Sequence, residues 1–433
     1  MKWLLLFSLG LMTVEVKAQK VISLNQAVSI ARENNLWNKI SKQEFEAATA
    51  DYEDSKNAIL PQVSLGGSYQ RFSKVTLFQD GLGDTKQMSR KPGPTSAGTG
   101  IEAAFNLYTG GRQQAAIEEQ RQRRDLAGLT TQEQQSSITL QVSIQYFDLV
   151  NTIEQQKLIA EQLARAEVRL KNIRALYRNT KVTRSDVLRA EVMLANVQLQ
   201  AERAANDRMI SNNRLKLLLN QKDQEIIMPA DSAGMPLPTV PPLTLKNDGL
   251  ANASYAVRKA QASEGLLQTR LKLIKSNYKP TVTMFSAYNF SYPNYLFFTP
   301  IDQAYSIGFL GIKVQYNLSS LYHNKNKEIA ASIRLQESKQ VGQAVADNVS
   351  EHIEALHIKY HESLNRIEVA QKTIEQTKDN YRIVSTKYFN QLALLIDLLD
   401  ADNLYQESKY SLIRAEIDAL NYYHQLQFAQ GIL

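Results

Sequence analysis

The sequence predicts an α+β protein that combines very long coiled-coil helices with four β-strands, two in each of two similar halves. Three observations predict this fold class. The chain repeats itself internally, long segments carry apolar residues at every seventh position, and short segments alternate apolar with polar residues. The composition agrees with a folded chain, because 43% of its 433 residues are hydrophobic.

The residue content argues against several functional classes. The absence of Cys excludes disulfides, thiolate zinc sites and Cys nucleophiles. The formal net charge of +7 is a mild excess that is typical of a solvated surface, so we expect no nucleic-acid partner. His357 and His361 are four residues apart in a helical segment, but without a third strong ligand they predict an exposed face rather than a metal site. No catalytic trio or phosphate loop is visible, so neither an enzyme nor a cofactor is predicted.

Residues 1–19 form a separate segment at the start of the chain. Lys2 precedes an apolar run from Trp3 to Met12, and Ala18 offers a small residue at a cleavage point before Gln19. This pattern predicts a secretory signal peptide. The run is too short to span a bilayer, and nowhere later does an apolar run reach the length of a membrane-spanning helix. We therefore expect an exported chain without a transmembrane helix.

A proline-rich stretch separates two similar halves. Five of the 11 Pro residues lie between Pro229 and Pro242, which excludes a helix interior there. An offset of 211 residues aligns the halves and matches Tyr177, Asn179, Asp186, Leu188 and Ala190 with Tyr388, Asn390, Asp397, Leu399 and Ala401. Internal duplication is the simplest explanation. We therefore divide the chain after the signal peptide into a first repeat, residues 20–228, a linker, residues 229–246, and a second repeat, residues 247–433.

The longest helix of the first half is expected from about Gly111 to Arg178. At ~1.5 Å per residue it spans roughly 100 Å, far more than a globular domain needs. Its apolar seam consists of Val142, Leu149, Leu163, Leu170 and Tyr177. In the second half, the small residues Ala401, Ser408 and Ala415 accompany a similar seam and allow close approach of neighbouring helices. These patterns predict packed coiled-coil helices rather than helices that lie on a membrane surface.

Two segments follow a two-residue period instead. Residues 101–107 and 312–318 each alternate apolar with polar side chains, so one face of either strand is apolar and the other polar. Half of the residues from Phe285 to Phe298 are aromatic, which suits the interface girdle of a membrane barrel. A soluble sandwich edge packed on the helices would show the same alternation, and this alternative stays open.

Four strands per chain cannot enclose a water-filled lumen or hide their own edges from lipid. Other chains must therefore complete the sheet. Three copies would supply twelve strands, an even number like that of bacterial barrels. Helices of the expected length beneath such a barrel would bridge most of a periplasm.

Several short motifs occur together along nearly the whole chain after the signal peptide. They are Leu24-Asn25-Gln26-Ala27-Val28 with Asn34-Asn35-Leu36, the strand start Leu60-Pro61, the turn Asn106-Leu107-Tyr108-Thr109-Gly110-Gly111-Arg112, and the two turns that join the long helices. With them the chain resembles the TolC family of outer-membrane efflux and secretion channels. The resemblance implies a homotrimer with a twelve-stranded barrel in outer-membrane lipid and an α-helical tunnel in the periplasm. It also implies an exit duct of a tripartite efflux or type I secretion system, opened by a periplasmic adaptor protein and an inner-membrane transporter.

The resemblance further implies where such a channel closes. In this family, acidic residues after the second helical turn narrow the periplasmic entrance, and Asp397 and Asp400 occupy the matching positions. Three chains would place six carboxylates around one axis, and carboxylates clustered in a narrow pore attract cations and bind divalent ions. Without the resemblance, the two Asp residues can also be explained as the solvated face of a helix whose Leu398 and Leu399 pack.

We also predict that charge pairs hold this entrance closed. Residues 169–191 are rich in basic side chains, whereas the segment related to them by the 211-residue offset is acidic. In this alignment Arg189 corresponds to Asp400. Arg184 or Arg189 is expected to pair with Asp397 or Asp400 across neighbouring helices. Each exposed pair contributes about 0 to 1 kcal/mol, so a threefold set would bias a gate without locking it. The candidates for closing the gate are Arg184, Arg189, Asp186 and Tyr388.

Both turns between the long helices depart from the family pattern. Where the family usually carries Gly after Tyr-x-Asn, this chain has Thr180 and Gln391. Asn179 and Asn390 can adopt the left-handed conformation that a turn needs, so the fold tolerates the change. The resemblance implies adaptor contacts at these four residues, and the missing Gly alters the usual contact.

Two other functions stay open at this point. A secreted coiled-coil scaffold or adhesin would explain the heptads, but it would leave the matched strand pairs and the signal peptide without a common cause. The exit channel of a metal-efflux system would share every feature above, because the tunnel sequence does not reveal the cargo.

Overall fold

The computed structural model describes residues 19–73, 76–78, 80–86, 95–222, 225–240, 248–292 and 303–433. The predicted signal peptide up to residue 18, part of the predicted linker, and the aromatic residues Tyr295, Phe297 and Phe298 lie outside these ranges. The chain divides into two compact units. The helical unit consists of Met1–Gln43, Leu129–Arg258 and Ala344–Leu433, and the sheet unit consists of Glu44–Gly128 and Lys259–Gln343.

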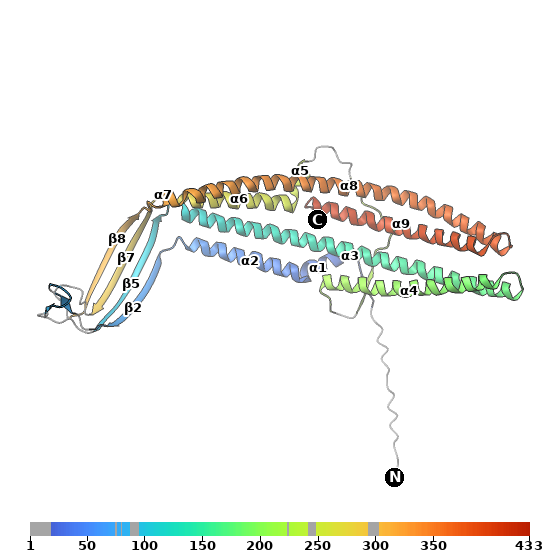
Figure 1. The fold of residues 1–433 in the computed structure, drawn as a ribbon, viewed down its shortest axis with the longest axis horizontal. Coiled ribbons are helices and arrows are strands. Elements are labelled where there is room, and N and C mark those ends of the chain that lie inside the picture. Colours follow the sequence, from blue (N-terminus) through green and yellow to red (C-terminus); the bar gives the residue numbers. More distant parts are fainter. Residues whose placement is uncertain are drawn as a thin grey trace, which may run out of the picture. The chain divides into compact units, whose positions relative to one another are not determined.

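Four long helices dominate the described chain (Figure 1). They form two helical hairpins, one from α3 (Arg112–Arg178) and α4 (Arg184–Leu219), the other from α8 (Lys325–Phe389) and α9 (Leu395–Ala429). The long helix predicted over residues 111–178 is thus confirmed. The shorter helices are α1 (Leu24–Asn34), α2 (Leu36–Asn57), α5 (Asp248–Ala253), α6 (Tyr255–Ser276) and α7 (Ser320–His323). No helix of the described residues combines the length and the apolar character that crossing a membrane requires.

The sheet unit contains one antiparallel sheet of four strands in the order β2-β5-β7-β8. These are β2 (Gln62–Arg71), β5 (Thr95–Tyr108), β7 (Thr281–Tyr292) and β8 (Tyr305–Gln315), two from each half of the chain as predicted. Two smaller pairings complete the described strands. They are β3 (Leu77–Phe78) with β4 (Thr85–Lys86), and β1 (Gln19–Ile22) with β6 (Ile226–Pro229), the latter parallel.

The register of this sheet places most of its large apolar side chains on one face. Leu65 pairs with Ile101, and Ile101 pairs with Tyr288, so these three side chains share a face. Each of them is about half exposed or more in the single chain. The exposed apolar residues of this face are Val63, Leu65, Tyr69, Ile101, Met284, Tyr288, Phe290, Leu310, Ile312 and Val314.

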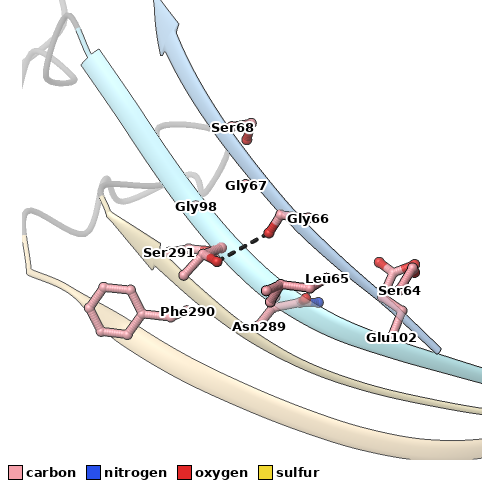
Figure 2. A pocket seen from close by; sticks show the side chains of 12 residues that line it. Ser64, Leu65, Gly66, Gly67, Ser68, Gly98, Glu102, Asn289, Phe290 and Ser291 are labelled. Carbon is pink, nitrogen blue, oxygen red and sulfur yellow. Dashed lines mark hydrogen bonds between the residues drawn. The ribbon is translucent and has the colours of Figure 1, made fainter.

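The opposite face carries small and polar residues over β2 and β5. A shallow depression there is lined by Ser64, Gly66, Gly98, Glu102 and Asn289, among others (Figure 2). A Cβ at position 100 would collide with the amide of Asn289, so a glycine is required there for that side chain to lie across β5. The alternation predicted from Ile312 onward does not extend to the first half of β8. Ile307 and Phe309 lie on this opposite face and are exposed, because the register pairs them with Asn289 and Ala287.

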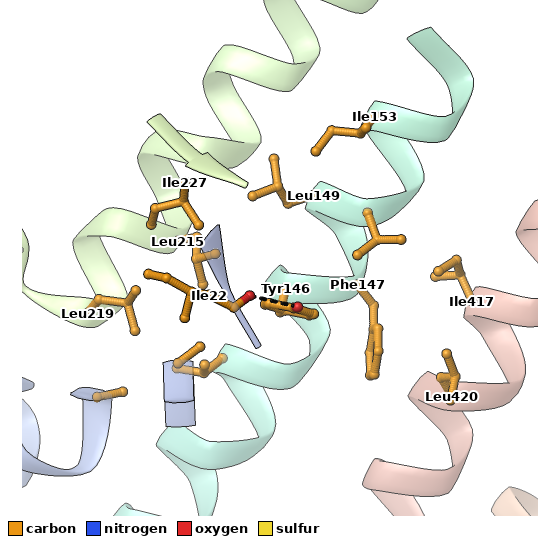
Figure 3. Close-up of a cluster of buried hydrophobic side chains, with 14 of the residues drawn as sticks. Ile22, Tyr146, Phe147, Leu149, Ile153, Leu215, Leu219, Ile227, Ile417 and Leu420 are labelled. Carbon is orange, nitrogen blue, oxygen red and sulfur yellow. Dashed lines mark hydrogen bonds between the residues drawn. The ribbon is translucent and has the colours of Figure 1, made fainter. Parts of the chain in front are cut away.

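Tyr146 of α3 lies at the centre of the largest core cluster of the helical unit (Figure 3). The ring is fully buried, and its hydroxyl lies 2.9 Å from the carbonyl oxygen of Ile22 and 2.7 Å from Asp231 Oδ2. The same carboxylate oxygen accepts the N–H of Leu24 at the start of α1. Burial and the hydrogen bond to Asp231 raise the pKa of Tyr146, so the phenol stays protonated and continues to donate. One hydroxyl thus links α3 to the backbone of β1.

His424 of α9 is a partly buried imidazole beside the same core. Its ring centroid lies 5.6 Å from that of Phe147, and its Nδ1 finds no hydrogen-bond partner among the described residues. Burial lowers the pKa of His424, because the charged form loses its hydration. The unfolded chain binds this proton near pH ~6.5, whereas the folded chain binds it only at lower pH. The free energy of unfolding should therefore fall as the pH drops below about 6.5.

This pH dependence can be measured as the melting temperature at pH ~7.5 and pH ~5.5, the range in which histidine titrates. We expect His424→Gln to lose less stability on acidification than the wild type, each compared with its own value at the higher pH. The exposed His352→Gln serves as a control and should keep the wild-type dependence. Equal losses in the wild type and His424→Gln would contradict the prediction.

Candidate functional site

The two turns that join the long helices have the same hydrogen bonds. The N–H of Thr180 donates to the carbonyl of Tyr177 at 2.9 Å, and the N–H of Gln391 donates to that of Tyr388 at 2.9 Å. One residue later, the N–H of Lys181 reaches the carbonyl of Leu176, and the N–H of Leu392 reaches that of Lys387. These positions are related by the offset of 211 residues found in the sequence. The two turns therefore repeat each other in these backbone hydrogen bonds.

Both turns place the left-handed residue one position later than the sequence suggested. Thr180 has φ 58° and Gln391 has φ 64°, whereas Asn179 and Asn390 are not left-handed. The N–H of Asn179 still bonds to the carbonyl of Ala175, so the Asn residues end their helices and the following residue makes the turn. A β-branched residue such as Thr180 is strained in this region, by roughly 1–3 kcal/mol.

The helices after the turns begin with an acidic residue in the same capping position. In α4, Asp186 Oδ2 accepts the N–H of Thr183 at 2.9 Å, and Thr183 Oγ1 accepts the N–H of Asp186 at 3.2 Å. In α9, Asp397 Oδ2 accepts the N–H of Leu394 at 2.9 Å. A carboxylate is also favoured at a helix N-terminus by the helix dipole. Asp397 thus has a structural task of its own, independent of any channel.

The predicted gate residues lie near the start of α9, but the predicted pairs do not form within one chain. Asp397 and Asp400 are exposed beside the buried Leu398 and Leu399. Among the described residues, no ion pair joins either of them to Arg184 or Arg189. This arrangement is open to pairing with a second copy.

Tyr388 belongs to the buried cluster beneath these turns. Its side chain is 5% exposed and packs in one cluster with Leu170, Ile173, Leu395 and Leu398. Its hydroxyl has no hydrogen-bond partner in the described part of the chain. Burial raises the pKa of Tyr388, nearby Asp186 adds to this effect, and Arg169 opposes it. The structure thus brings the candidates Tyr388 and Asp186 near each other from different hairpins.

The sequence reasoning missed a buried ion-pair cluster close to these residues. Asp402 of α9 lies between Arg165 and Arg169 of α3, with Arg165 Nε 3.3 Å from Asp402 Oδ1 and Arg169 Nη2 on Asp402 Oδ2. The side chains of Asp402 and Arg169 are 4% and 8% exposed. The available signal was a charged residue next to Ala401 in a seam of small and apolar residues. The partners, however, lie more than 230 positions away in the sequence.

The His pair that was set aside in the sequence also behaves differently from expectation. His357 is buried rather than part of an exposed face, because this side of α8 packs inward, and its ring centroid lies 4.5 Å from that of His361. Within the described residues, no group of three or more His, Asp or Glu side chains gathers in a way that would hold a metal.

Comparison with known proteins finds a family that part of this chain resembles. The model of the family described as outer membrane efflux protein matches residues 27–221. This match covers less than half of the 433 residues. The resemblance recognised in the sequence is thereby confirmed, and the family description agrees with the predicted outer-membrane localisation and efflux role. No curated protein matches the chain.

Solved structures confirm the fold over nearly the whole chain. The outer membrane protein VceC of Vibrio cholerae has a TM-score of 0.78 at 15% identity, covering 94% of this chain and 96% of its own. The CmeC outer membrane channel of Campylobacter jejuni has a TM-score of 0.77 at 15% identity, with 94% and 85% covered. The open state of the MtrE outer membrane channel of Neisseria gonorrhoeae has a TM-score of 0.75 at 17% identity, with 94% and 88% covered. The chain therefore has the fold of outer-membrane channels, and the fold class predicted from the sequence is confirmed.

Proposed function

We propose that this efflux-family chain is one subunit of a homotrimeric outer-membrane channel, a passive exit duct of a tripartite efflux or type I secretion system. One observation carries the proposal. The four-stranded sheet exposes an apolar face, and its outer strands β2 and β8 each have one partner among the described residues. An open, apolar sheet of this kind is unfavourable in water and in lipid unless its edges are closed.

Closure by further copies follows from the strand directions. β2, β5, β7 and β8 alternate in direction, so β8 of one copy and β2 of the next can pair in antiparallel fashion. Three copies then make a barrel of twelve strands whose apolar face meets lipid. The face with Ser64, Gly66 and Glu102 lines the lumen in this arrangement.

The periplasmic entrance is proposed at the start of α9. Asp397 and Asp400 of three copies form a ring of carboxylates that favours cations and binds divalent ions. The turns with Thr180 and Gln391 and the adjoining Asn179 and Asn390 are the proposed contacts of a periplasmic adaptor, which acts together with an inner-membrane transporter. A metal-efflux cargo fits the same duct. A secreted scaffold or adhesin is disfavoured, because the exposed apolar sheet face has no purpose in it.

Single-channel conductance in planar bilayers tests the channel and its gate together. We expect small cation-selective channels that divalent cations block, and in Asp397→Asn/Asp400→Asn we expect a larger conductance without the block. Asn retains an acceptor for the N–H of Leu394, so the helix start should survive the change. Asp379→Asn, an exposed change on α8, should behave like the wild type.

Two results would overturn these proposals. A wild-type protein that fractionates as soluble and conducts no current would end the channel proposal. Channels whose divalent block persists in Asp397→Asn/Asp400→Asn would leave the channel intact and remove the carboxylate gate.

A further inference from the structure

The contact between α3 and α9 joins the two helical hairpins within the helical unit. α3 belongs to the hairpin of the first half, and α9 belongs to that of the second. Charged groups cross this contact at Asp402, which binds Arg165 and Arg169, and at Lys409, whose Nζ lies 2.9 Å from Glu161 Oε2. The hairpins are thus connected by ion pairs as well as by apolar packing.

The pair of Asp402 with Arg169 differs from the other ion pairs by its burial. Both side chains are less than a tenth exposed, and no other ion pair of the described residues has two partners buried to this degree. By contrast, the pair of Arg174 with Glu191, inside the first hairpin, is 53% and 39% exposed. A buried charge that loses its partner keeps the full cost of its lost hydration, so this pair is far harder to break than an exposed one.

Unpaired polar atoms, donors as well as an acceptor, lie around Asp402. Arg165 Nη2 is buried without a partner among the described residues, and so is the amide of Gln406, one turn further along α9 and 3% exposed. Both oxygens of Asp402 are already engaged, Oδ1 by Arg165 and Oδ2 by Arg169. Asp402 therefore accepts hydrogen bonds from both arginines, and its negative charge offsets part of their positive charge.

Asp402 also lies close to the proposed entrance. It follows Asp397 by five residues and Asp400 by two on one uninterrupted helix, α9. Successive turns of a helix keep a fixed position relative to one another, because backbone hydrogen bonds hold the helix geometry. Whatever holds Asp402 in place therefore also holds the two carboxylates before it.

We propose that Asp402 is a positioning residue for the channel entrance. By binding Arg165 and Arg169 of α3, it fixes the first turns of α9 against the first hairpin and keeps Asp397 and Asp400 in the closed arrangement. This inference rests on the proposed function. A movement that opens the entrance by separating the hairpins has to break the contacts of Asp402, whereas a movement of α3 and α9 together leaves them intact.

Single-channel recording of two variants separates positioning from stability. Asp402→Asn leaves the buried Arg169 without its carboxylate and removes the closer carboxylate partner of Arg165. We therefore expect a severalfold higher conductance or open probability together with a lower melting temperature. The triple variant Arg165→Gln/Arg169→Gln/Asp402→Asn, which we call the neutral layer, removes these ion pairs without leaving a buried charge. Its melting temperature should return towards the wild-type value while the conductance stays high. Glu191→Gln, which breaks the exposed pair with Arg174, is the control and should leave both quantities unchanged.

The outcomes separate this inference from the proposed function. If the neutral layer recovers both wild-type melting and wild-type conductance, Asp402 serves stability alone and the inference fails while the channel stands. If neither variant changes the conductance of a channel that divalent cations block, the inference fails in the same way. If the wild-type protein forms no channel, the proposed function fails before Asp402 is tested.

Discussion

Leu310→Arg should abolish assembly of the protein into outer membranes. Leu310 lies within β8 on the apolar face of the sheet and is 71% exposed in the single chain. In the proposed barrel this face meets the lipid, where an arginine near the midplane costs about 2–4 kcal/mol. Three copies place three such charges in one barrel, so the assembled form is disfavoured by several times that amount.

The measurement is the share of protein recovered as trimer in the outer-membrane fraction. Ile307→Arg is the matched control, because Ile307 is an exposed aliphatic residue of the same strand on the opposite face. On that face the arginine points into water, so assembly should be close to normal. Equal loss in both variants would show that the two faces are not divided between lipid and lumen.

The sequence was sufficient for the elements whose patterns are local. A seven-residue apolar period and the turn residues after Arg178 were enough to place α3 within a residue of its observed bounds. The alternation at Ile101 and Ile312 likewise identified two of the four strands and their apolar face. Such patterns are visible because each residue's environment repeats along its own helix or strand.

Features that depend on two distant segments were not accessible in the same way. The cluster of Asp402 with Arg165 and Arg169 depends on the alignment of α9 against α3, which no short-range period determines. The left-handed turn residue was misplaced by one position for a related reason. Asn179 favours the left-handed region by itself, but the last hydrogen bond of α3 keeps it helical and shifts the turn to Thr180. The hydrogen bonding of the helix thus outweighed the left-handed preference of Asn179.

Leu398→Ala should destabilise the region around the proposed entrance more than any nearby surface change. Leu398 is 1% exposed and belongs to the cluster in which α9 packs with Leu170, Ile173 and Tyr388. Truncating a buried leucine removes its burial energy and leaves a cavity, which together cost about 2–5 kcal/mol. The exposed Leu404→Ala on the same helix should change the free energy of unfolding by roughly 0.5 kcal/mol or less.

Denaturant unfolding of the solubilised protein, compared between Leu398→Ala and Leu404→Ala, measures this difference. Leu398 lies between Asp397 and Asp400 on α9, so a cavity beneath it also loosens the carboxylates that we assign to the gate. We therefore expect Leu398→Ala to weaken the divalent block, although it removes no charge. An unfolding free energy equal to that of Leu404→Ala would show that the cluster relaxes into the space. In that case the position of the gate carboxylates would depend on the ion pairs of Asp402 rather than on apolar packing.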